Sequence, residues 1–159
     1  MKTTIIALFL AFNCLAQQKE NNIIKTLDSI SKSQFTLLYQ KDIDGFLNVY
    51  AKNYYDLGSE EYINRKEWKK RLEQYVNSTK FNELKGKSGN EIVDGSKTQI
   101  YNYEEIKNSK INIDSSNFKL QKNDYLVYIY FLPEYNIGEE GWYGFFRLIY
   151  GKWKVVAGD

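Results

Sequence analysis

The chain has 159 residues and carries 22 lysines and arginines against 20 aspartates and glutamates, a formal net charge of +2. This near-neutral balance argues against a nucleic-acid partner, which would require a basic face. Histidine is absent, so Ser-His-Asp and Cys-His catalysis and histidine-based metal or dehydratase mechanisms are excluded. The sequence also has no Gly-rich phosphate loop and no cysteine metal site, and we expect neither a metal nor a cofactor.

Residues 1–16 have the pattern of an export signal. Lys2 supplies a positive start, Ile5 to Phe12 an apolar run, and Cys14-Leu15-Ala16 a small-x-small cleavage site. The apolar run is far shorter than the ~20 residues that cross a bilayer. We expect cleavage near Ala16, a periplasmic or secreted product, and no membrane span in the mature chain. Lipidation at Cys14 is the weaker alternative, because Asn13 stands where a small residue normally precedes a lipidated cysteine.

Residues 17–159 are expected to form one domain that begins with three helices. Apolar residues recur at helical spacing between residues 22 and 39, with Gln34 interrupting the stripe. Asp42 is a good N-cap for a second helix. That helix is expected to bury Phe46, Leu47, Tyr50 and Ala51. A short extended passage over residues 52–58 then leads to the third helix.

The third helix has the clearest local signals. Asn64 and Glu67 stand at capping-box spacing, and Ile63 before the cap can touch Trp68 in the first turn. The expected buried stripe consists of Trp68, Leu72, Tyr75 and Val76. The basic cluster beside it, Lys69, Lys70 and Arg71, is interpreted as a solvated helix face rather than an anion site.

A long loop and then a series of strands are predicted next. Residues 79–97 are polar and rich in glycine, which favours a loop, either a lid or an ordinary flexible connection. Strands are predicted at 98–104, 110–114, 117–122 and 125–132, with turn residues between them. The last strand is apolar on both faces, which is typical of a central strand. Pro133 ends it, because proline cannot donate to the ladder.

Residues 142–159 predict a terminal β-hairpin with a two-residue turn at Gly151-Lys152. This turn places Tyr150 opposite Trp153 and Arg147 opposite Val156. One face then carries Phe146, Leu148, Tyr150, Trp153 and Val155 and is expected to lie on a core. The other face carries Tyr143, Phe145, Arg147, Ile149 and Lys154, which is too apolar for a plain solvent face. Both faces of the sheet are therefore expected to be covered.

Helices followed by strands indicate an α+β fold, with three N-terminal helices packed on a curved, mostly antiparallel sheet that ends in the hairpin. Two stretches carry a family resemblance. They are the helix junction Lys41-Asp42-Ile43-Asp44-Gly45-Phe46 and the ending Phe146-Arg147-x-x-Tyr150-Gly151-Lys152-Trp153-Lys154-Val155-Val156. Both are similar to parts of the nuclear transport factor 2-like superfamily, over about residues 33–159. The resemblance implies a cone-like half-barrel with an apolar pocket between sheet and helices, often dimeric through the outer sheet face.

The same resemblance locates the positions of the isomerase residues. Ketosteroid isomerases pair an acidic base with a tyrosine and a protonated carboxyl group. With the helix junctions aligned, Gln34 stands at the position of the first-helix tyrosine and Gly58 at that of the base, so both are lost. Asp56 is close enough to enter the same pocket as a substitute base. Alternatively, Asp56 is a turn residue before Gly58.

Three functional hypotheses follow. The leading one is an exported, non-catalytic domain that binds a small apolar or amphipathic ligand or a protein partner. The aromatic residues expected to line its pocket are Tyr54, Trp68, Tyr128, Tyr130 and Trp142. The second hypothesis is a small lyase or isomerase that uses Asp56 with a tyrosine.

The third hypothesis is a homodimer or interaction module built on the outer face of the sheet. The residues expected on this surface are Tyr143, Phe145, Arg147 and Ile149. Arg147 is expected to pair there with an acid of a neighbouring strand or with a dimer mate. The alternative for Arg147 is a pocket position in which it holds a carboxylate bidentately.

Overall fold

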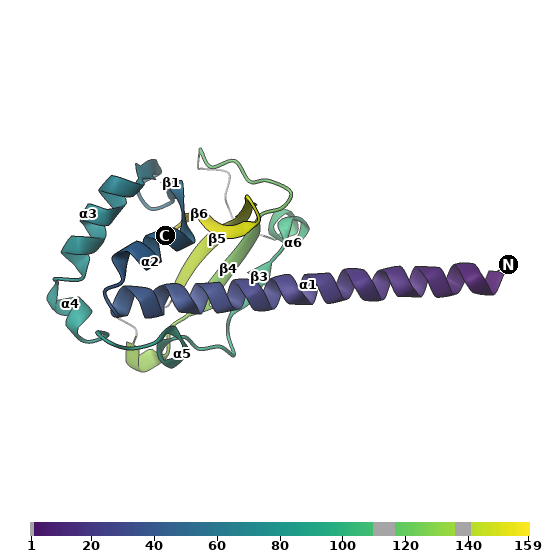
Figure 1. The fold of residues 1–159 in the computed structure, drawn as a ribbon, viewed down its shortest axis with the longest axis horizontal. Helices are drawn as coiled ribbons and strands as arrows, with labels where there is room; N and C mark the ends of the chain where they lie inside the picture. The colour runs from purple at the N-terminus through teal and green to yellow at the C-terminus, as the bar shows by residue number, and fades with distance from the viewer. Residues whose placement is uncertain (1, 110–116, 136–140) are drawn as a thin grey trace.

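The computed structural model describes residues 2–109, 117–135 and 141–159, with side chains from Gln17 onward except that of Lys80, and confirms the α+β fold class (Figure 1). A long N-terminal helix and several short helices pack on a six-stranded, curved and unclosed sheet that is mostly antiparallel. The helices are α1 (Lys2–Tyr39), α2 (Ile43–Val49), α3 (Arg65–Tyr75), α4 (Thr79–Asn82), α5 (Gly89–Ile92) and α6 (Tyr103–Asn108), with a 3-10 turn, η1 (Pro133–Tyr135). The strands are β1 (Tyr50–Asp56), β2 (Glu61–Asn64), β3 (Gln99–Tyr101), β4 (Tyr125–Tyr130), β5 (Gly141–Ile149) and β6 (Lys152–Gly158).

The first helix is longer than the segment predicted between residues 22 and 39. It runs without interruption from Lys2 to Tyr39, and its N-terminal part extends away from the sheet in Figure 1. Its C-terminal part enters the core through Leu27, Phe35 and Leu38, which are buried. Among the residues that the structure describes, no helix combines the length and the apolar character needed to cross a membrane.

Both predicted helix caps are present. The carboxylate of Asp42 accepts a hydrogen bond from the Gly45 N–H at 2.9 Å, and the side chain of Asn64 accepts from the N–H groups at the start of α3. These bonds satisfy donors that have no partner within the helix. The predicted reciprocal bond from Glu67 is replaced, because the Glu67 carboxylate accepts from Arg71 instead.

The second helix ends at Val49, two residues earlier than predicted. Tyr50 and Ala51 therefore belong to β1, where successive side chains point to opposite faces of the sheet. Tyr50 joins the core on the helix side, and Ala51 packs on the other side. The predicted extended passage is the second half of this strand.

The strand order is β2-β1-β6-β5-β4-β3, and only the β1–β6 pair among these six strands is parallel. Strand β4 lies between β5 and β3, as expected for the apolar run before Pro133. Strand β2 has no counterpart among the predicted strands. Of its residues only Ile63 is buried, so it lacks the alternation that identifies a half-buried strand.

Residues 79–97 are not the open loop that their composition suggests. They contain α4 and α5, and their apolar side chains, Phe81, Leu84, Ile92 and Val93, are all buried. Gly89 approaches α1 so closely that a Cβ atom there would lie 1.9 Å from the carbonyl oxygen of Lys32. Glycine at this position therefore serves close packing, and the segment is part of the domain core.

The strands predicted between residues 98 and 122 are only partly present. The first is cut short, since β3 ends at Tyr101 and Asn102 caps α6. The prediction at 110–114 lies outside the described residues. The prediction at 117–122 is wrong, although Phe118 is buried. Backbone N–H groups of this segment donate to the Tyr55 hydroxyl and the Asp124 carboxylate instead of a neighbouring strand.

The terminal hairpin is present, but its register differs from the prediction. Leu148 pairs with Trp153 and Arg147 with Lys154, so the two turn residues are Tyr150 and Gly151. Both have positive φ angles, 48° and 75°, which is the requirement of a type I′ turn. The predicted Gly151-Lys152 turn is therefore wrong by one residue, because Tyr150 adopts the left-handed conformation and takes the first turn position.

The tip of the hairpin extends beyond its neighbours in the sheet. Strand β4 begins opposite Phe146 and the pairing with β1 begins at Val155. Leu148 is consequently 51% exposed and Tyr150 fully exposed, which corrects the prediction that both lie on the core.

Deeper in the sheet, both faces are covered as expected. Phe146 and Val155 belong to a core cluster beneath α1, α2 and α3, and Phe145 and Ala157 to a second cluster with Ile106 of α6. We call the first side the inner face and the second the outer face. The inner face carries the candidate site.

Candidate ligand-binding cavity

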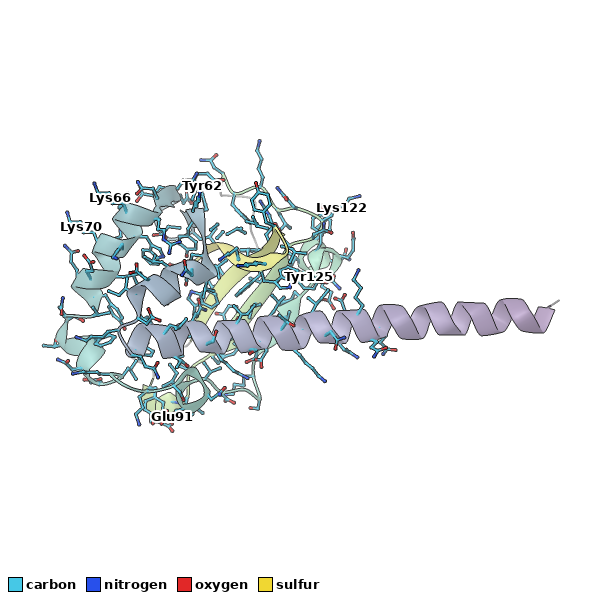
Figure 2. All side chains as sticks on the ribbon, viewed as in Figure 1. Tyr62, Lys66, Lys70, Glu91, Lys122 and Tyr125 are labelled. Carbon is cyan, nitrogen blue, oxygen red and sulfur yellow. The ribbon has the colours of Figure 1, made fainter. Side chains whose placement is uncertain are left out.

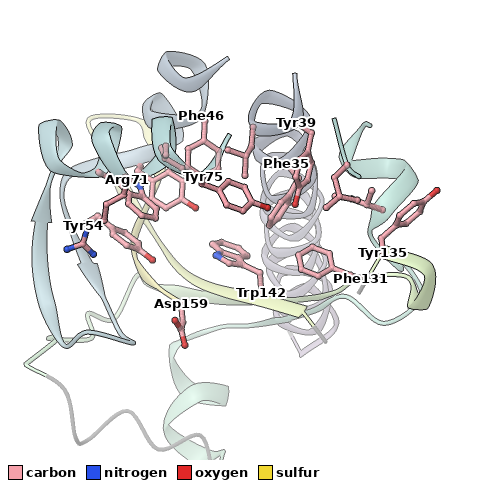
Figure 3. Close-up of a pocket in the computed structure, with 16 residues that line it drawn as sticks. Phe35, Tyr39, Phe46, Tyr54, Arg71, Tyr75, Phe131, Tyr135, Trp142 and Asp159 are labelled. Atoms are coloured by element: carbon pink, nitrogen blue, oxygen red, sulfur yellow. The ribbon is translucent and has the colours of Figure 1, made fainter. Parts of the chain in front are cut away.

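A partly open cavity of about 460 Å³ lies between the helices and the inner face of the sheet (Figure 3). This volume is within the range of small-molecule pockets. Most of the lining is apolar or aromatic. The lining side chains come from α1 (Phe35, Leu38, Tyr39), α2 and β1 (Phe46, Tyr50, Tyr54), α3 (Trp68, Arg71, Leu72, Tyr75), the 84–92 segment (Leu84, Ile92) and the sheet and its connections (Phe131, Tyr135, Trp142, Asp159).

One end of the cavity is a compact group of aromatic rings. Trp68 stacks on Tyr54 with ring centroids 5.6 Å apart and planes 12° apart, and Tyr50 meets both rings edge-on. The Trp68 indole nitrogen is buried and has no hydrogen-bond partner among the described residues. Such contacts favour rigid ring positions, so this end of the cavity is held by packing rather than by polar bonds.

The other end is organised around Trp142 at the start of β5. Its indole meets Phe35 of α1 edge-on, with centroids 5.9 Å apart, and it also contacts the ring of Phe146. The indole lies across Gly144, where a Cβ atom would come 2.4 Å from the ring. Any side chain at residue 144 would therefore push the indole out of its present place.

Three tyrosines of the cavity, Tyr39, Tyr50 and Tyr54, are kept uncharged by burial. Burial raises the pKa of Tyr50 well above its ordinary value. Burial, with smaller contributions from Tyr50 and the carboxylates of Asp56 and Asp159, does the same to the pKa of Tyr54. The pKa of Tyr39 is raised by burial and by its neighbour Tyr75. These phenols therefore remain protonated hydrogen-bonding groups at neutral pH.

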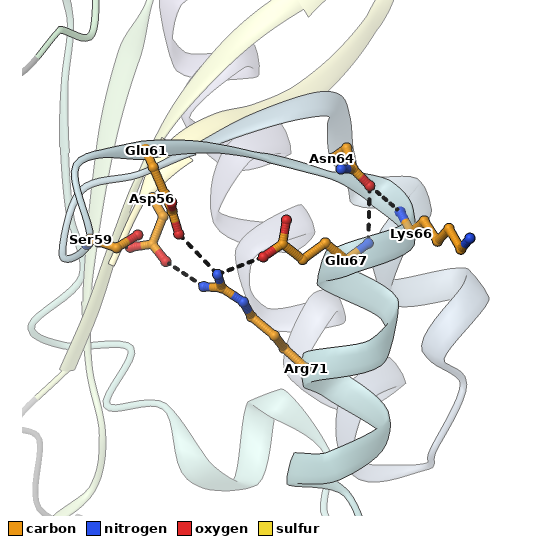
Figure 4. Close-up of polar contacts among 7 residues, drawn as sticks. All are labelled: Asp56, Ser59, Glu61, Asn64, Lys66, Glu67 and Arg71. Atoms are coloured by element: carbon orange, nitrogen blue, oxygen red, sulfur yellow. Dashed lines mark hydrogen bonds and ion pairs between the residues drawn. The ribbon is translucent and has the colours of Figure 1, made fainter.

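Arg71 is the cation of the cavity rim, and three carboxylates surround it (Figure 4). Its guanidinium lies 2.9 Å from Glu61, 2.9 Å from Glu67 and 3.5 Å from Asp56. Hydrogen bonds to Glu61 and Glu67 raise the pKa of Arg71. Of the lysines of α3, Lys66 and Lys70 point outward into solvent (Figure 2), and Lys69 pairs with Asp44 at 2.9 Å. Arg71 is thus not part of a plain solvated face, which corrects the interpretation of the basic cluster for this residue alone.

Asp56 has the geometry of a turn residue. One of its carboxylate oxygens accepts hydrogen bonds from the N–H groups of Gly58 and Ser59, at 3.0 and 3.1 Å. The other faces Arg71. These contacts match the turn-residue alternative for Asp56, and Asp56 is not among the residues that line the cavity. The carboxylate that does line the cavity belongs to Asp159, which the sequence analysis does not single out.

Three of the five aromatic residues expected in the pocket line the cavity, namely Tyr54, Trp68 and Trp142. Tyr128 and Tyr130 do not, because they alternate with the inward-facing Val127 and Ile129 and so lie on the outer face. There Tyr128 stacks on Tyr143 with planes 3° apart, and Tyr130 lies 5.0 Å from Tyr128.

The residues expected on the outer face do lie on that side, but not all are accessible. Phe145 is 1% exposed beneath Phe118, so it cannot contribute to a partner surface. Tyr143 and Ile149 are half-buried in the same cluster.

Arg147 pairs within the chain rather than with a dimer mate. It makes two 2.7 Å hydrogen bonds to the fully buried Asp124, which directly precedes β4, and a third to the Lys119 carbonyl. Pairing with an acid beside a neighbouring strand was one of the alternatives for this residue. The pocket alternative is wrong, because the cavity lies on the opposite face of the sheet.

Gln34 is fully buried, and both polar atoms of its side chain lack partners among the described residues. It does not line the cavity. Within the described residues, no group of histidine, cysteine, aspartate or glutamate side chains could hold a metal ion.

Comparison with known proteins identifies neither a family nor a function for the chain. No protein-family model matches the chain, and no curated protein sequence matches it. The cavity is therefore interpreted from its own geometry.

Proposed function

We propose that the domain binds a small apolar or amphipathic molecule in the cavity between α1, α3 and the inner face of the sheet. The observation that carries this proposal is the open volume of about 460 Å³ among rigidly packed rings. Cores are normally packed without voids of this size, and large apolar cavities with a few polar groups are the usual form of ligand sites.

The proposal is for binding without catalysis. The carboxylate considered as a base, Asp56, is committed to a turn and to Arg71. The buried tyrosines have raised pKa values, so they are poor proton acceptors at neutral pH. The carboxylate that the lyase or isomerase hypothesis requires is thus engaged elsewhere, and Asp159 is the one carboxylate of the described cavity lining. The lyase or isomerase hypothesis is therefore the less supported one.

Export and family membership belong to the same proposal. The signal-like pattern of residues 1–16 supports export of the domain. The α+β architecture with a cavity between sheet and helices supports the resemblance to the nuclear transport factor 2-like superfamily.

The test is to fill the cavity and measure ligand binding. Native mass spectrometry of the purified chain is expected to show a bound small molecule, and a neutral fluorescent probe such as N-phenyl-1-naphthylamine is expected to bind. Leu84→Trp should abolish both, because the larger ring would occupy the cavity that Leu84 lines. Leu72→Phe serves as a second filling variant in case the first does not fold.

The matched control is Leu148→Trp, which adds the same ring on the exposed hairpin tip. This variant should bind the probe as the parent does. Equal binding by a folded cavity-filled variant and the control would overturn the proposal.

A further inference from the structure

The cavity contains an indole N–H that a ligand can reach. Trp142 lines the cavity, and its nitrogen points into the open volume in Figure 3. No group among the described residues accepts a hydrogen bond from this nitrogen, and the nitrogen is not buried in the way that the Trp68 nitrogen is. It is therefore accessible, in contrast to the buried nitrogen of Trp68. An indole nitrogen can only donate a hydrogen bond.

The position of this donor is fixed by its surroundings. Gly144 leaves the space into which the indole lies, and Phe35 and Phe146 meet the ring edge-on. A donor held in place before binding loses little entropy when an acceptor arrives. The arrangement is thus suited to an oxygen acceptor at one defined point of an otherwise apolar ligand.

The charges at the rim disfavour an anion. Arg71 is the cation among the described lining side chains, and Asp56, Glu61 and Glu67 already surround it. A further carboxylate, that of Asp159, lines the same cavity. A ligand anion would have to compete for Arg71 and approach Asp159 while losing its hydration, which is costly for an unpaired charge.

From these observations we propose that the ligand is an uncharged molecule with an apolar body and a carbonyl or similar oxygen that accepts a hydrogen bond from Trp142. This inference rests on the proposed function and narrows it to one chemical class. Fatty acids and other anionic amphiphiles are excluded by it.

The experiment uses three probes of nearly equal shape: 2-acetylnaphthalene, 2-ethylnaphthalene and 2-naphthoate. Binding is measured by calorimetry on the full chain, together with the ¹H–¹⁵N resonances of the indole groups. 2-Acetylnaphthalene should bind about three- to tenfold more tightly than the hydrocarbon, the usual effect of one added hydrogen bond. It should also move the Trp142 indole proton downfield. 2-Naphthoate should bind more weakly than both.

Trp142→Phe keeps an aromatic ring but removes the N–H, so the acetyl and ethyl compounds should bind this variant with equal affinity. Trp153→Phe is the matched control, because Trp153 packs on Tyr125 outside the cavity and the preference should persist. Equal binding of the acetyl and ethyl compounds, or tightest binding of the naphthoate, would overturn the inference while the binding function stands. Failure of all three probes to bind would contradict the proposed function itself.

Discussion

The inner and outer faces of the sheet both bury aromatic side chains, but in different ways. On the inner face, rings from α1, β1, α3 and β5 surround an open volume of about 460 Å³. On the outer face, Phe118 packs on Phe145 with centroids 5.1 Å apart, and the segment that carries Phe118 is held by the pair between Arg147 and Asp124. The same alternation of side chains along the strands thus supports a cavity on one side and, on the other, a packed aromatic cluster beside a buried ion pair.

The two arginines show the difference in chemical terms. Arg71 on the inner rim is 38% exposed and shares three partly exposed acids, whereas Arg147 on the outer face holds one acid that is fully buried. Exposed ion pairs contribute little to stability, and breaking a buried pair is expensive. We therefore expect the outer arginine to be important for folding and the inner one for the electrostatics of the cavity.

The largest predicted effect is on stability. Arg147→Met leaves Asp124 buried without its partner, and it should lower the free energy of unfolding by about 3–5 kcal/mol. Arg71→Met, the same change on the inner rim, should cost about 1 kcal/mol or less. Urea unfolding followed by tryptophan fluorescence measures both. Similar losses in the two variants would contradict the distinction between the faces. Adding Asp124→Leu to Arg147→Met should restore part of the loss.

An alkaline pH series that compares the parent with Tyr50→Phe examines one buried tyrosine of the inner face. Tyr50 has a raised pKa because it is buried, so between its ordinary pKa of about 10 and the native value only the unfolded chain loses the proton. Stability due to this group is complete below pH 10 and falls above it, with a slope of up to about 1.4 kcal/mol per pH unit. Tyr50→Phe should make the fall of the unfolding free energy with pH shallower by the contribution of one proton. An unchanged slope of the urea midpoint between pH 9.5 and 11 would contradict this.

The sequence predicts those parts of the fold that depend on local patterns. The caps at Asp42 and Asn64, the apolar strand before Pro133 and the hairpin all follow from residue types at fixed spacing. The sequence does not predict the helices between residues 79 and 92, because their few apolar residues show no helical periodicity. These helices depend instead on tertiary contacts, such as that of Gly89 with α1.

The cavity is less predictable than the fold for the same reason. Tyr54, Trp68 and Trp142 are found as aromatic residues, but the side to which a strand residue points depends on register, which misplaces Tyr128 and Tyr130. The role of Arg71 had one available signal, the i, i+4 spacing from Glu67. Its other partners, Asp56 and Glu61, become neighbours only when β1 and β2 pair.

The smallest predicted effect tests whether the inner face depends on α3 as a preformed helix. Asn64→Ala removes the acceptor for the N–H groups of Lys66 and Glu67 and should cost about 1 kcal/mol. Asn64→Asp keeps an acceptor and should be close to the parent. Helix α3 carries Trp68 and Arg71 into the cavity, whereas the described outer-face cluster includes no residue of α3. Hydrogen exchange in Asn64→Ala should therefore increase in α3 and stay unchanged in α6. Equal increases in both helices would mean that the two faces unfold as one unit.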